Sequence, residues 1–474
     1  MNLSAHAAFQ SAIGPAHVLT GKDCAPYRPD WTRQYTANPS MVLRPANTEE
    51  VAACLRIASA HRLAIVPTGG RTGITGAIHT DGGVMLSLER MNRIREIRPD
   101  SRIALVEAGV VLSRLHDAAE AQGLYFPLWF GARGSAMIGG VLSTNAGGSN
   151  VLRYGSTRGL CMGLEVVLAD GRVLNLMSEL HKDNSGYDLK QIFIGAEGTL
   201  GIITAAVMKL APKPRAYATA TLAVRSLPDA LELLHHLQAA SGGLVEGFEY
   251  MPASYLTRVS QIRPDLRPPF ARQYDINILI ELGAIRDEDC RPMDDGSLPI
   301  ANLLESALAP MLADGRVLDA IIAQSQQQRL DMWARREAAG EVMQAVQPSV
   351  DTDICLPLDK IDIFLTRIEA RLPQIDPSAY SVCVAHLGDG NLHYSLYPNR
   401  DDAGLHDALI EAVEDEVAAL GGSFSAEHGV GLMKLNTMAR RKDPAALQVM
   451  RAMKAALDPY DILNPGKVIP PLSL

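Results

Sequence analysis

The sequence predicts an α+β fold that is divided among more than one domain. Its length, a mixture of helical and alternating patterns, and one strong break in these patterns support this prediction. At 474 residues the chain is about three times as long as a typical domain of roughly 150 residues. The run Ala-Pro-Lys-Pro-Arg at 211–215 disfavours both helix and strand, so we place a domain boundary there.

The first part of the chain, residues 1–213 with a core from about residue 40, combines helices with short strands. A helix is predicted over 45–62, because Asn47 or Thr48 can cap its start and apolar residues recur along one face. Alternating apolar residues flank the turn-forming dipeptide Asp170-Gly171 and predict a hairpin over 164–176. Buried strands are predicted over 63–66, 84–88 and 103–108.

The rest of the chain is expected to form two further parts, 214–420 and 421–474. The first of these has the pattern of an α+β domain with long antiparallel strands, and the second is expected to be a helical segment. The predicted strands are 276–282, 380–385 and 393–397, and the predicted helices are 227–240 and 444–457.

Composition and charge exclude several classes of protein. The 53 acidic residues exceed the 44 basic ones, and no run rich in Lys and Arg is present, so nucleic acid is not an expected partner. No apolar run approaches the roughly 18 residues that span a bilayer, and the N-terminal residues do not resemble a secretory signal. We therefore expect a cytoplasmic protein without an integral membrane segment. Six scattered cysteines without a CxxC pair argue against a disulfide framework.

Glycine is concentrated in three stretches, 69–76, 131–159 and 195–201. Backbone N–H groups of such loops can approach an anion closely, because no Cβ intervenes. Any one stretch alone is explained equally well by ordinary turns, but three within 133 residues favour a large phosphate-bearing cofactor. No GxGxxG motif opens a helix and no P-loop motif is present, so a nucleotide-binding fold of another kind is required.

The segment from His386 to His393 has the sequence HLGDGNLH and lies between two predicted strands. On the two arms of a hairpin the imidazoles can face each other, and Glu427 can complete a site of two histidines and one carboxylate. Such a donor set is typical of a catalytic metal site. The neighbouring His428 can then act as a general base near neutral pH. A single histidine on an apolar strand is more often a core residue, and His428 can also have a purely structural role.

Six motifs are spread over nearly the whole chain: PTGGRTGITGA, GGVLSTNAGGSNVLRYGSTRG, KDNSGYDLKQIFIGAEGTLGIIT, HLGDGNLH, SAEHGVG and LDPYDILNPGK. Together they resemble the motifs of the FAD-linked D-2-hydroxyacid dehydrogenases, relatives of D-lactate and D-2-hydroxyglutarate dehydrogenases. The resemblance implies the vanillyl-alcohol-oxidase (p-cresol-methylhydroxylase) type of fold, with an FAD-binding domain of two α+β subdomains, a substrate domain with an antiparallel sheet and a C-terminal helical segment.

The resemblance also implies which residues bind FAD. Relatives with covalent flavin have a histidine in the first glycine loop, where this chain has Arg71, so we expect non-covalent FAD. The residues implied for the cofactor are Pro67, Thr68, Gly69, Gly70, Arg71, Thr72, Gly73, Gly134, Ser135, Gly139, Thr144, Asn145, Gly147, Gly148, Gly198, Gly201, Ile202, Ile203 and Asn464.

For the reaction itself, the resemblance implies a divalent metal, usually zinc, held by His386, His393 and Glu427, with His428 as the base. Arg336 matches the arginine that binds the substrate carboxylate, a task that suits the two parallel donors of guanidinium. Without the resemblance, the sequence predicts that Arg336 is a surface arginine of a helix, paired with a nearby glutamate.

The chain departs from the hydroxyglutarate pattern at three positions. The resemblance implies threonine, lysine and asparagine in the hydroxyglutarate dehydrogenases where this sequence has Gly340, Asp351 and Ser395. These differences remove a cation and add an acid. They weaken the case for a dicarboxylate substrate, because its distal carboxylate would lack a partner of opposite charge. Residues 352–355 resemble the D-lactate branch instead.

The expected function is oxidation of a D-2-hydroxy acid, lactate-like or larger, to the 2-keto acid, with hydride passing from C2 to flavin N5. Three alternatives remain: a flavin-free metal-dependent hydrolase or lyase acting on a phosphorylated substrate, a D-2-hydroxyglutarate dehydrogenase with altered carboxylate contacts, and a non-catalytic flavin-binding subunit. The sequence leaves open the electron acceptor (a quinone, an electron-transfer flavoprotein or oxygen), the metal and the oligomeric state, for which a homodimer is one option.

Overall fold

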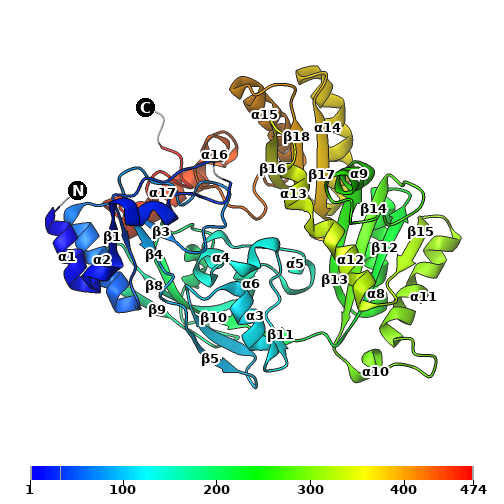
Figure 1. Ribbon diagram of the computed structural model, residues 1–474, viewed down its shortest axis with the longest axis horizontal. Helices are drawn as coiled ribbons and strands as arrows, with labels where there is room; N and C mark the ends of the chain where they lie inside the picture. The colour runs from blue at the N-terminus through cyan, green and yellow to red at the C-terminus, as the bar shows by residue number, and fades with distance from the viewer. Residues whose placement is uncertain (1–2, 33, 472–474) are drawn as a thin grey trace. The chain divides into compact units, whose positions relative to one another are not determined.

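The computed structural model of the protein describes residues 3–32 and 34–471 (Figure 1). The chain forms two compact units. The first comprises 1–147, 155–212 and 427–474, and the second comprises 148–154 and 213–426. The short segment 148–154 therefore belongs to the second unit, although the sequence analysis assigned it to the first part of the chain.

The first unit contains two main sheets. In the smaller sheet, of order β1-β2-β4-β3, β4 is parallel to both β2 and β3, whereas β1 is antiparallel to β2. The larger sheet, of order β5-β6-β10-β8-β9, is antiparallel throughout, and a third ladder pairs β11 with β7. The strands are β1 (Val18–Thr20), β2 (Met41–Leu43), β3 (Ile65–Thr68), β4 (Val84–Ser87), β5 (Ile94–Arg98), β6 (Ile103–Glu107), β7 (Leu124–Tyr125), β8 (Cys161–Val167), β9 (Val173–Leu176), β10 (Ile202–Lys209) and β11 (Ala211–Pro212).

Helices α1 and α2 share a core with the smaller sheet, in which Phe9 and Leu55 pack with strand residues such as Leu43 and Leu86. Helix α2 begins where the sequence predicts, because the Asn47 side chain accepts a hydrogen bond from the Glu50 amide. The helices of this unit are α1 (Leu3–Ile13), α2 (Thr48–His61), α3 (Leu112–Glu120), α4 (Ile138–Thr144), α6 (Thr157–Leu160), α7 (Lys190–Phe193), α16 (Leu435–Arg441) and α17 (Pro444–Leu457).

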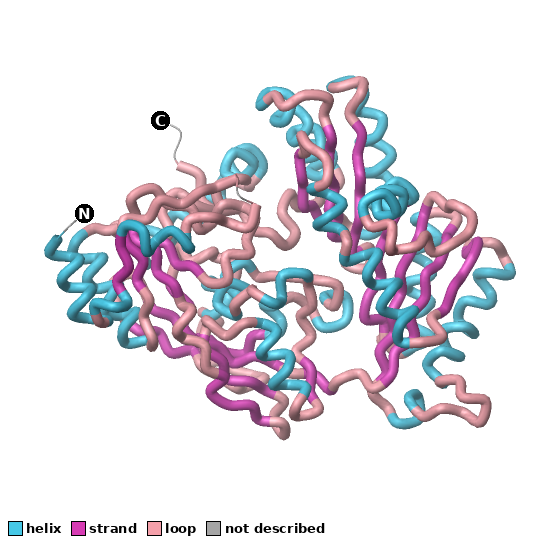
Figure 2. Tube along the Cα trace, viewed as in Figure 1, coloured by secondary structure: helices cyan, strands magenta, loops and turns pink. Residues whose placement is uncertain are grey.

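The second unit is built on one seven-stranded sheet of order β15-β12-β14-β13-β17-β18-β16. Figure 2 draws strands in magenta and helices in cyan. Every pair of neighbouring strands is antiparallel, as predicted. The strands are β12 (Ala216–Val224), β13 (Val245–Pro252), β14 (Ile276–Ala284), β15 (Val317–Ile322), β16 (Val350–Cys355), β17 (Tyr380–His386) and β18 (Asn391–Tyr397).

The two faces of this sheet differ in chemistry. One face forms an apolar core with α8, α11, α14 and α15, to which strand residues such as Phe248, Ile280 and Leu392 contribute. Helices α9, α12 and α13 pack against part of the other face. The helices of this unit are α5 (Val151–Tyr154), α8 (Leu227–Ser241), α9 (Ala253–Ile262), α10 (Asp287–Cys290), α11 (Pro299–Ala313), α12 (Gln326–Glu337), α13 (Ala339–Gln344), α14 (Ile361–Ile375) and α15 (Ala403–Ala419).

The second face carries the titratable side chains of the sheet. Because neighbouring residues of a strand point to opposite faces, residues beside Phe248 and Leu392 in sequence lie on the face away from the apolar core. Strand pairing aligns Glu249 with His386, and Asp353 with His393. The sheet thus brings one acid and one histidine together at each of two places on the same face.

The segment 148–154 is fixed to the second unit by Glu246, a buried residue of β13. Asn150 donates a hydrogen bond to the Glu246 carboxylate over 2.9 Å, and the Tyr154 hydroxyl donates to it over 2.8 Å. Arg153 forms an ion pair with the same carboxylate. A single buried acid therefore contacts three side chains of this segment, and Leu152 of the same segment packs against the apolar core of the second unit.

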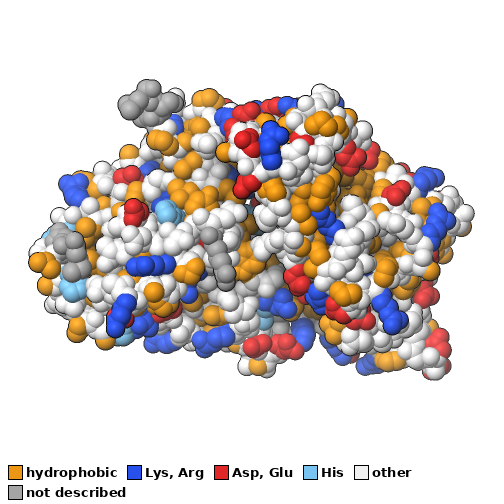
Figure 3. Space-filling view, turned by 45° about the horizontal axis from the view of Figure 1, so that its top comes forward, with side chains coloured by type: hydrophobic (Ala, Val, Ile, Leu, Met, Phe, Trp, Pro, Cys, Tyr) orange, Lys and Arg blue, Asp and Glu red, His pale blue; other side chains and the backbone are white. Residues whose placement is uncertain are grey.

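On the face of the molecule shown in Figure 3, basic and acidic side chains are interspersed and form no extended basic patch. Among residues 3–32 and 34–471, no helix is both long and apolar enough to cross a membrane.

Candidate active site

The three glycine-rich stretches converge within the first unit. Gly70 and Ser135 lie in contact, since a Cβ on Gly70 would stand only 2.0 Å from the Ser135 carbonyl oxygen. This close approach requires glycine at position 70. The amide of Glu197 donates to the Ser143 carbonyl over 2.8 Å and joins the second stretch to the third. Residues implied for the cofactor, though distant in sequence, are thus brought together by the fold.

Two buried polar atoms near these loops have no protein partner among the described residues. They are Oγ1 of Thr68, at the end of β3, and Oδ1 of Asn464. The Asn464 amide nitrogen donates to the carbonyl oxygens of Ala77 and Glu197. Because buried polar groups are normally hydrogen-bonded, a nucleotide cofactor bound here would satisfy the two remaining atoms. The residues therefore fit a flavin nucleotide.

Lys467 is a buried cation in the same unit, with 7% of its surface exposed. Its ammonium donates to the Pro465 carbonyl, and it forms no ion pair within the described residues. Burial lowers the pKa of Lys467 to about 8. A buried cation without an anionic partner is unfavourable, so this position suits an anionic ligand such as a nucleotide.

The segment that carries His428 is held by the first unit. The Glu197 carboxylate accepts hydrogen bonds from the amides of Val430, at 2.7 Å, and Gly431, at 2.9 Å. Burial raises the pKa of Glu197, and these two hydrogen bonds oppose the shift. The Thr75 hydroxyl lies 3.5 Å from the His428 carbonyl oxygen. His428 therefore lies beside the first glycine loop.

The second unit contributes a buried group of charged residues around Glu249, which is 1% exposed. His386 Nδ1 lies 2.9 Å from Glu249 Oε1, and Arg336 Nε donates to Glu249 Oε2 over 2.7 Å. Burial alone would raise the pKa of Glu249, but the charges of His386 and Arg336 hold it below the ordinary value. Arg336 is thus a buried arginine on α12 and not a surface residue.

His386 and His393 share a face of the hairpin β17–β18, although they do not pair directly. In the strand register His386 pairs with Asn391, and His393 pairs with Val384. The two rings are 5.4 Å apart between centroids. Burial raises the pKa of Asp389, in the turn of the hairpin, to about 6.

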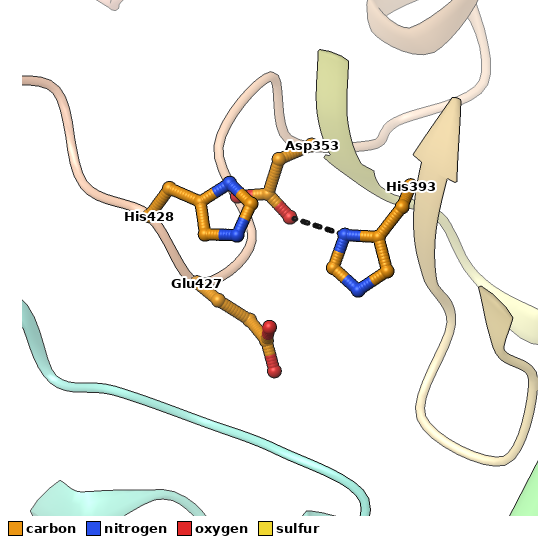
Figure 4. A group of neighbouring side chains, drawn as sticks. All are labelled: Asp353, His393, Glu427 and His428. Carbon is orange, nitrogen blue, oxygen red and sulfur yellow. Dashed lines mark ion pairs between the residues drawn. The ribbon is translucent and has the colours of Figure 1, made fainter. Parts of the chain in front are cut away.

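Four side chains form a group whose potential ligand atoms all lie within 4.8 Å of one another: Asp353, His393, Glu427 and His428 (Figure 4). The preceding segment explains this arrangement, because the Ala426 amide donates to the Asp353 carbonyl and Ser423 pairs with Cys355. Imidazole nitrogens and carboxylate oxygens are suitable ligands for zinc and similar divalent cations.

This group overlaps only in part with the ligands expected from the sequence. His393 and Glu427 belong to it, whereas His386 does not and instead contacts Glu249 and Arg336. Sequence reasoning did not select Asp353, Glu249, Glu197 or Lys467. An acid within the apolar strand sequence VEGFEYM is a signal that could have identified Glu249, since unpaired carboxylates are rarely buried.

Two of the three positions that depart from the hydroxyglutarate pattern contact each other. The Ser395 hydroxyl donates to the Asp351 carboxylate across β16 and β18. Asp351 lies two residues before Asp353 and on the same face of the sheet. Gly340 lies in α13 and is exposed.

The chain is similar to known flavin-dependent families and proteins. Residues 39–177 match the model of an FAD binding domain, and residues 213–468 match that of the C-terminal domain of FAD linked oxidases. The D-2-hydroxyglutarate dehydrogenase of Stutzerimonas stutzeri (strain A1501) is 36% identical over 470 residues, which cover 97% of each chain. The mitochondrial D-2-hydroxyglutarate dehydrogenase of Bos taurus is 38% identical over 461 residues, covering 97% of this chain and 82% of that protein.

Solved structures resemble the fold. Substrate-bound p-cresol methylhydroxylase superposes with a TM-score of 0.75 at 17% identity, covering 99% of this chain and 97% of that one. Alkyldihydroxyacetonephosphate synthase gives a TM-score of 0.73 at 18% identity, with coverages of 99% and 86%. The predicted p-cresol-methylhydroxylase type of fold is thereby confirmed. The chain therefore belongs to the family of FAD-linked oxidases that includes the D-2-hydroxyglutarate dehydrogenases.

Proposed function

We propose that this FAD-dependent oxidoreductase converts a D-2-hydroxy acid into the corresponding 2-keto acid. The observation that carries the proposal is the gathering of His393, Glu427, His428 and Asp353. His386 lies beside His393 on the same sheet face, and Arg336 of α12 contacts His386. An arginine, a group of metal-ligating side chains and a histidine base match the three parts of a 2-hydroxy acid that need recognition: carboxylate, hydroxyl oxygen and hydroxyl proton.

Each residue has a distinct role in this proposal. Arg336 binds the substrate carboxylate through its guanidinium. His393 and Glu427, with Asp353 beside them, hold a divalent cation that we propose to be zinc. His386 lies outside that group of four, but its ring is 5.4 Å from that of His393 between centroids, and we propose it as a further ligand. His428 accepts the hydroxyl proton as the C2–H bond breaks. When bound, FAD would supply the hydride acceptor, and the cation would lower the affinity of the hydroxyl for its proton.

The surroundings of His428 support its role as a base. Glu197 fixes the amides of residues 430 and 431, and Thr75 approaches the His428 carbonyl, so the backbone that carries the imidazole is held at three points. Precise positioning of a base lowers the entropic cost of proton transfer. The glycine loops 67–73 and 134–135 are proposed to hold non-covalent FAD in the same unit.

The distal end of the substrate is proposed to carry no second negative charge. Asp351 lies on the same face as Asp353, two residues away, and a carboxylate placed near it would be repelled. The curated relatives bear the name D-2-hydroxyglutarate dehydrogenase, so D-2-hydroxyglutarate is the natural competitor to test.

The test is to mix the oxidised protein anaerobically with D- and L-forms of lactate, larger 2-hydroxy monocarboxylates and 2-hydroxyglutarate, and to record the flavin absorbance. D-2-Hydroxy monocarboxylates are expected to bleach the flavin fastest, and L-enantiomers are expected to leave it oxidised. Absence of bleaching by every D-2-hydroxy acid would rule out the proposed reaction. Faster bleaching by D-2-hydroxyglutarate would contradict the role given to Asp351.

A further inference from the structure

Glu249 makes two charged contacts on one buried carboxylate. Nδ1 of His386 lies 2.9 Å from Glu249 Oε1 and 2.8 Å from Glu249 Oε2, and Oε2 also accepts from Nε of Arg336 at 2.7 Å. His386 is on β17, directly opposite Glu249 in the strand register, whereas Arg336 comes from α12. One carboxylate therefore fixes side chains from a strand and from a helix that covers it.

These contacts define the orientation of both partners. An ionised carboxylate is only an acceptor, so Nδ1 of His386 carries the proton and the imidazole plane is fixed by that hydrogen bond. In the same way the hydrogen bond through Nε fixes the plane of the Arg336 guanidinium. Nη2 of Arg336 then lies 3.3 Å from both ring nitrogens of His386.

We propose that Glu249 is a positioning residue that couples recognition of the substrate carboxylate by Arg336 to metal binding by His386. The inference rests on the proposed function, in which Arg336 binds the substrate carboxylate and His386 binds the metal. A carboxylate that binds the far nitrogen of a metal-ligating histidine orients the ring and increases its basicity, and its removal typically weakens metal binding roughly 10- to 100-fold. Glu249 would do this while also aiming the guanidinium.

The sheet provides a matched control. Glu281 of β14 is also buried, lies on the same face, and is paired with an arginine, Arg329, with further hydrogen bonds from Trp333 and Thr219. It contacts neither His386 nor Arg336. Arg329 and Trp333 belong to α12, the helix that also carries Arg336. Glu281→Gln therefore measures the effect of neutralising a buried, ion-paired acid that contacts this helix, without removing a contact of Arg336 or His386.

The test compares wild type, Glu249→Gln, Glu249→Asp and Glu281→Gln as flavin-loaded proteins. Two quantities are measured: KM and kcat for the best D-2-hydroxy acid, and zinc affinity by competition with a chelator. For Glu249→Gln we expect both a KM and a zinc dissociation constant increased roughly 10-fold or more. Glu249→Asp should have a KM and a zinc dissociation constant between those of wild type and Glu249→Gln, because aspartate keeps the negative charge. Glu281→Gln should stay within about 3-fold of wild type in both.

Several results would overturn the inference. If Glu249→Gln and Glu281→Gln changed KM and zinc affinity equally, Glu249 would contribute only to general stability. An unchanged KM in Glu249→Gln would exclude its effect on Arg336, and an unchanged zinc affinity would exclude its effect on His386. If Glu249→Gln does not fold, the same comparison is made with Glu249→Asp, whose shorter side chain must then disturb both quantities. A wild-type protein that binds zinc but is not bleached by any D-2-hydroxy acid would refute the proposed reaction, while the zinc measurements would still decide on Glu249.

Discussion

Gly431 and Thr75 approach so closely that a Cβ added to Gly431 would stand 2.3 Å from the Thr75 carbonyl oxygen. The backbone of Gly431 also has a φ of +52°, a conformation that side chains with a Cβ rarely adopt. This contact joins the segment that follows His428 to the first glycine loop. The position of the proposed base therefore depends on the absence of one methyl group.

Gly431→Ala should displace the first glycine loop, which is proposed to hold FAD, and the segment that carries His428. The left-handed conformation alone costs about 1 to 2 kcal/mol for alanine, and the clash with Thr75 adds to this. We expect lower flavin content after purification and a large decrease in the rate of flavin reduction by substrate. Gly404→Ala is the control, since Gly404 lies in α15 with only an ordinary contact near its added Cβ. Full flavin content and normal reduction in Gly431→Ala would disprove the importance of this contact.

Glu197→Gln should alter the pH dependence of stability. Burial raises the pKa of Glu197 in the folded protein, so between the ordinary value of 4.5 and the folded value the folded state binds more protons than the unfolded state. The stability contributed by this group therefore decreases as the pH rises through that window. The thermal unfolding midpoint of wild type should fall relative to that of Glu197→Gln as the pH increases from 4.5. If the unfolding midpoints of wild type and Glu197→Gln changed with pH in parallel, the raised pKa of Glu197 would be contradicted.

Local signals in the sequence were sufficient to predict much of the fold. The hairpin over 164–176 follows from alternating apolar residues around Asp170-Gly171, and the structure has β8 and β9 there, with Gly171 at a positive φ. The cap at Asn47 likewise predicts the start of α2. These elements depend on residues that are close in sequence, so their patterns are visible without the fold.

Features that depend on distant pairing were not predictable. Asp353 joins the group with His393 because β16 pairs with β18, which lies about forty residues later, and nothing in the local pattern specifies that register. The assignment of residues 148–154 to the first part failed for the same reason. That segment is held by Glu246, a side chain almost one hundred residues away.

His428→Ala tests the proposed base. Because the His428 side chain is not needed for the hydrogen bonds from Val430 and Gly431 to Glu197, the loop should keep its structure. The variant should stay yellow, with normal flavin content, and lose most of its flavin reduction by substrate, which corresponds to roughly 100-fold or more in rate. Stopped-flow absorbance under anaerobic conditions measures this directly. Wild-type reduction rates in His428→Ala would exclude this residue from proton transfer.

Lys467→Met should stabilise the apoprotein near neutral pH. The pKa of Lys467 is lowered from 10.5 to about 8 by burial, so the folded state binds fewer protons than the unfolded state between these values. The cost of holding the buried charge is therefore fully present below pH 8 and disappears as the pH rises toward 10.5. At pH 7 the variant should gain at most about 3 kcal/mol in its free energy of unfolding.

Addition of FAD separates this effect from a role in cofactor binding. If an anionic part of the nucleotide pairs with Lys467, FAD should stabilise wild type more than Lys467→Met. The difference between their unfolding midpoints should then become smaller or change sign. Equal stabilisation of both proteins by FAD would mean that Lys467 does not pair with the cofactor. Thermal unfolding of apo and FAD-loaded forms at pH 7 provides the measurement.

Asp351→Lys should shift substrate preference toward a dicarboxylate. Asp351 accepts a hydrogen bond from Ser395 and lies on the face of β16 that carries Asp353, so a cation at position 351 could pair with a distal carboxylate. The ratio of kcat/KM for D-2-hydroxyglutarate to that for D-lactate should rise about 10-fold or more, which corresponds to roughly 1.4 kcal/mol. Asp359→Lys makes the same change of net charge at an exposed position outside the sheet and is the control. A similar rise of this ratio in Asp351→Lys and Asp359→Lys would indicate long-range attraction of the doubly charged substrate. Asp351 would then not determine substrate specificity.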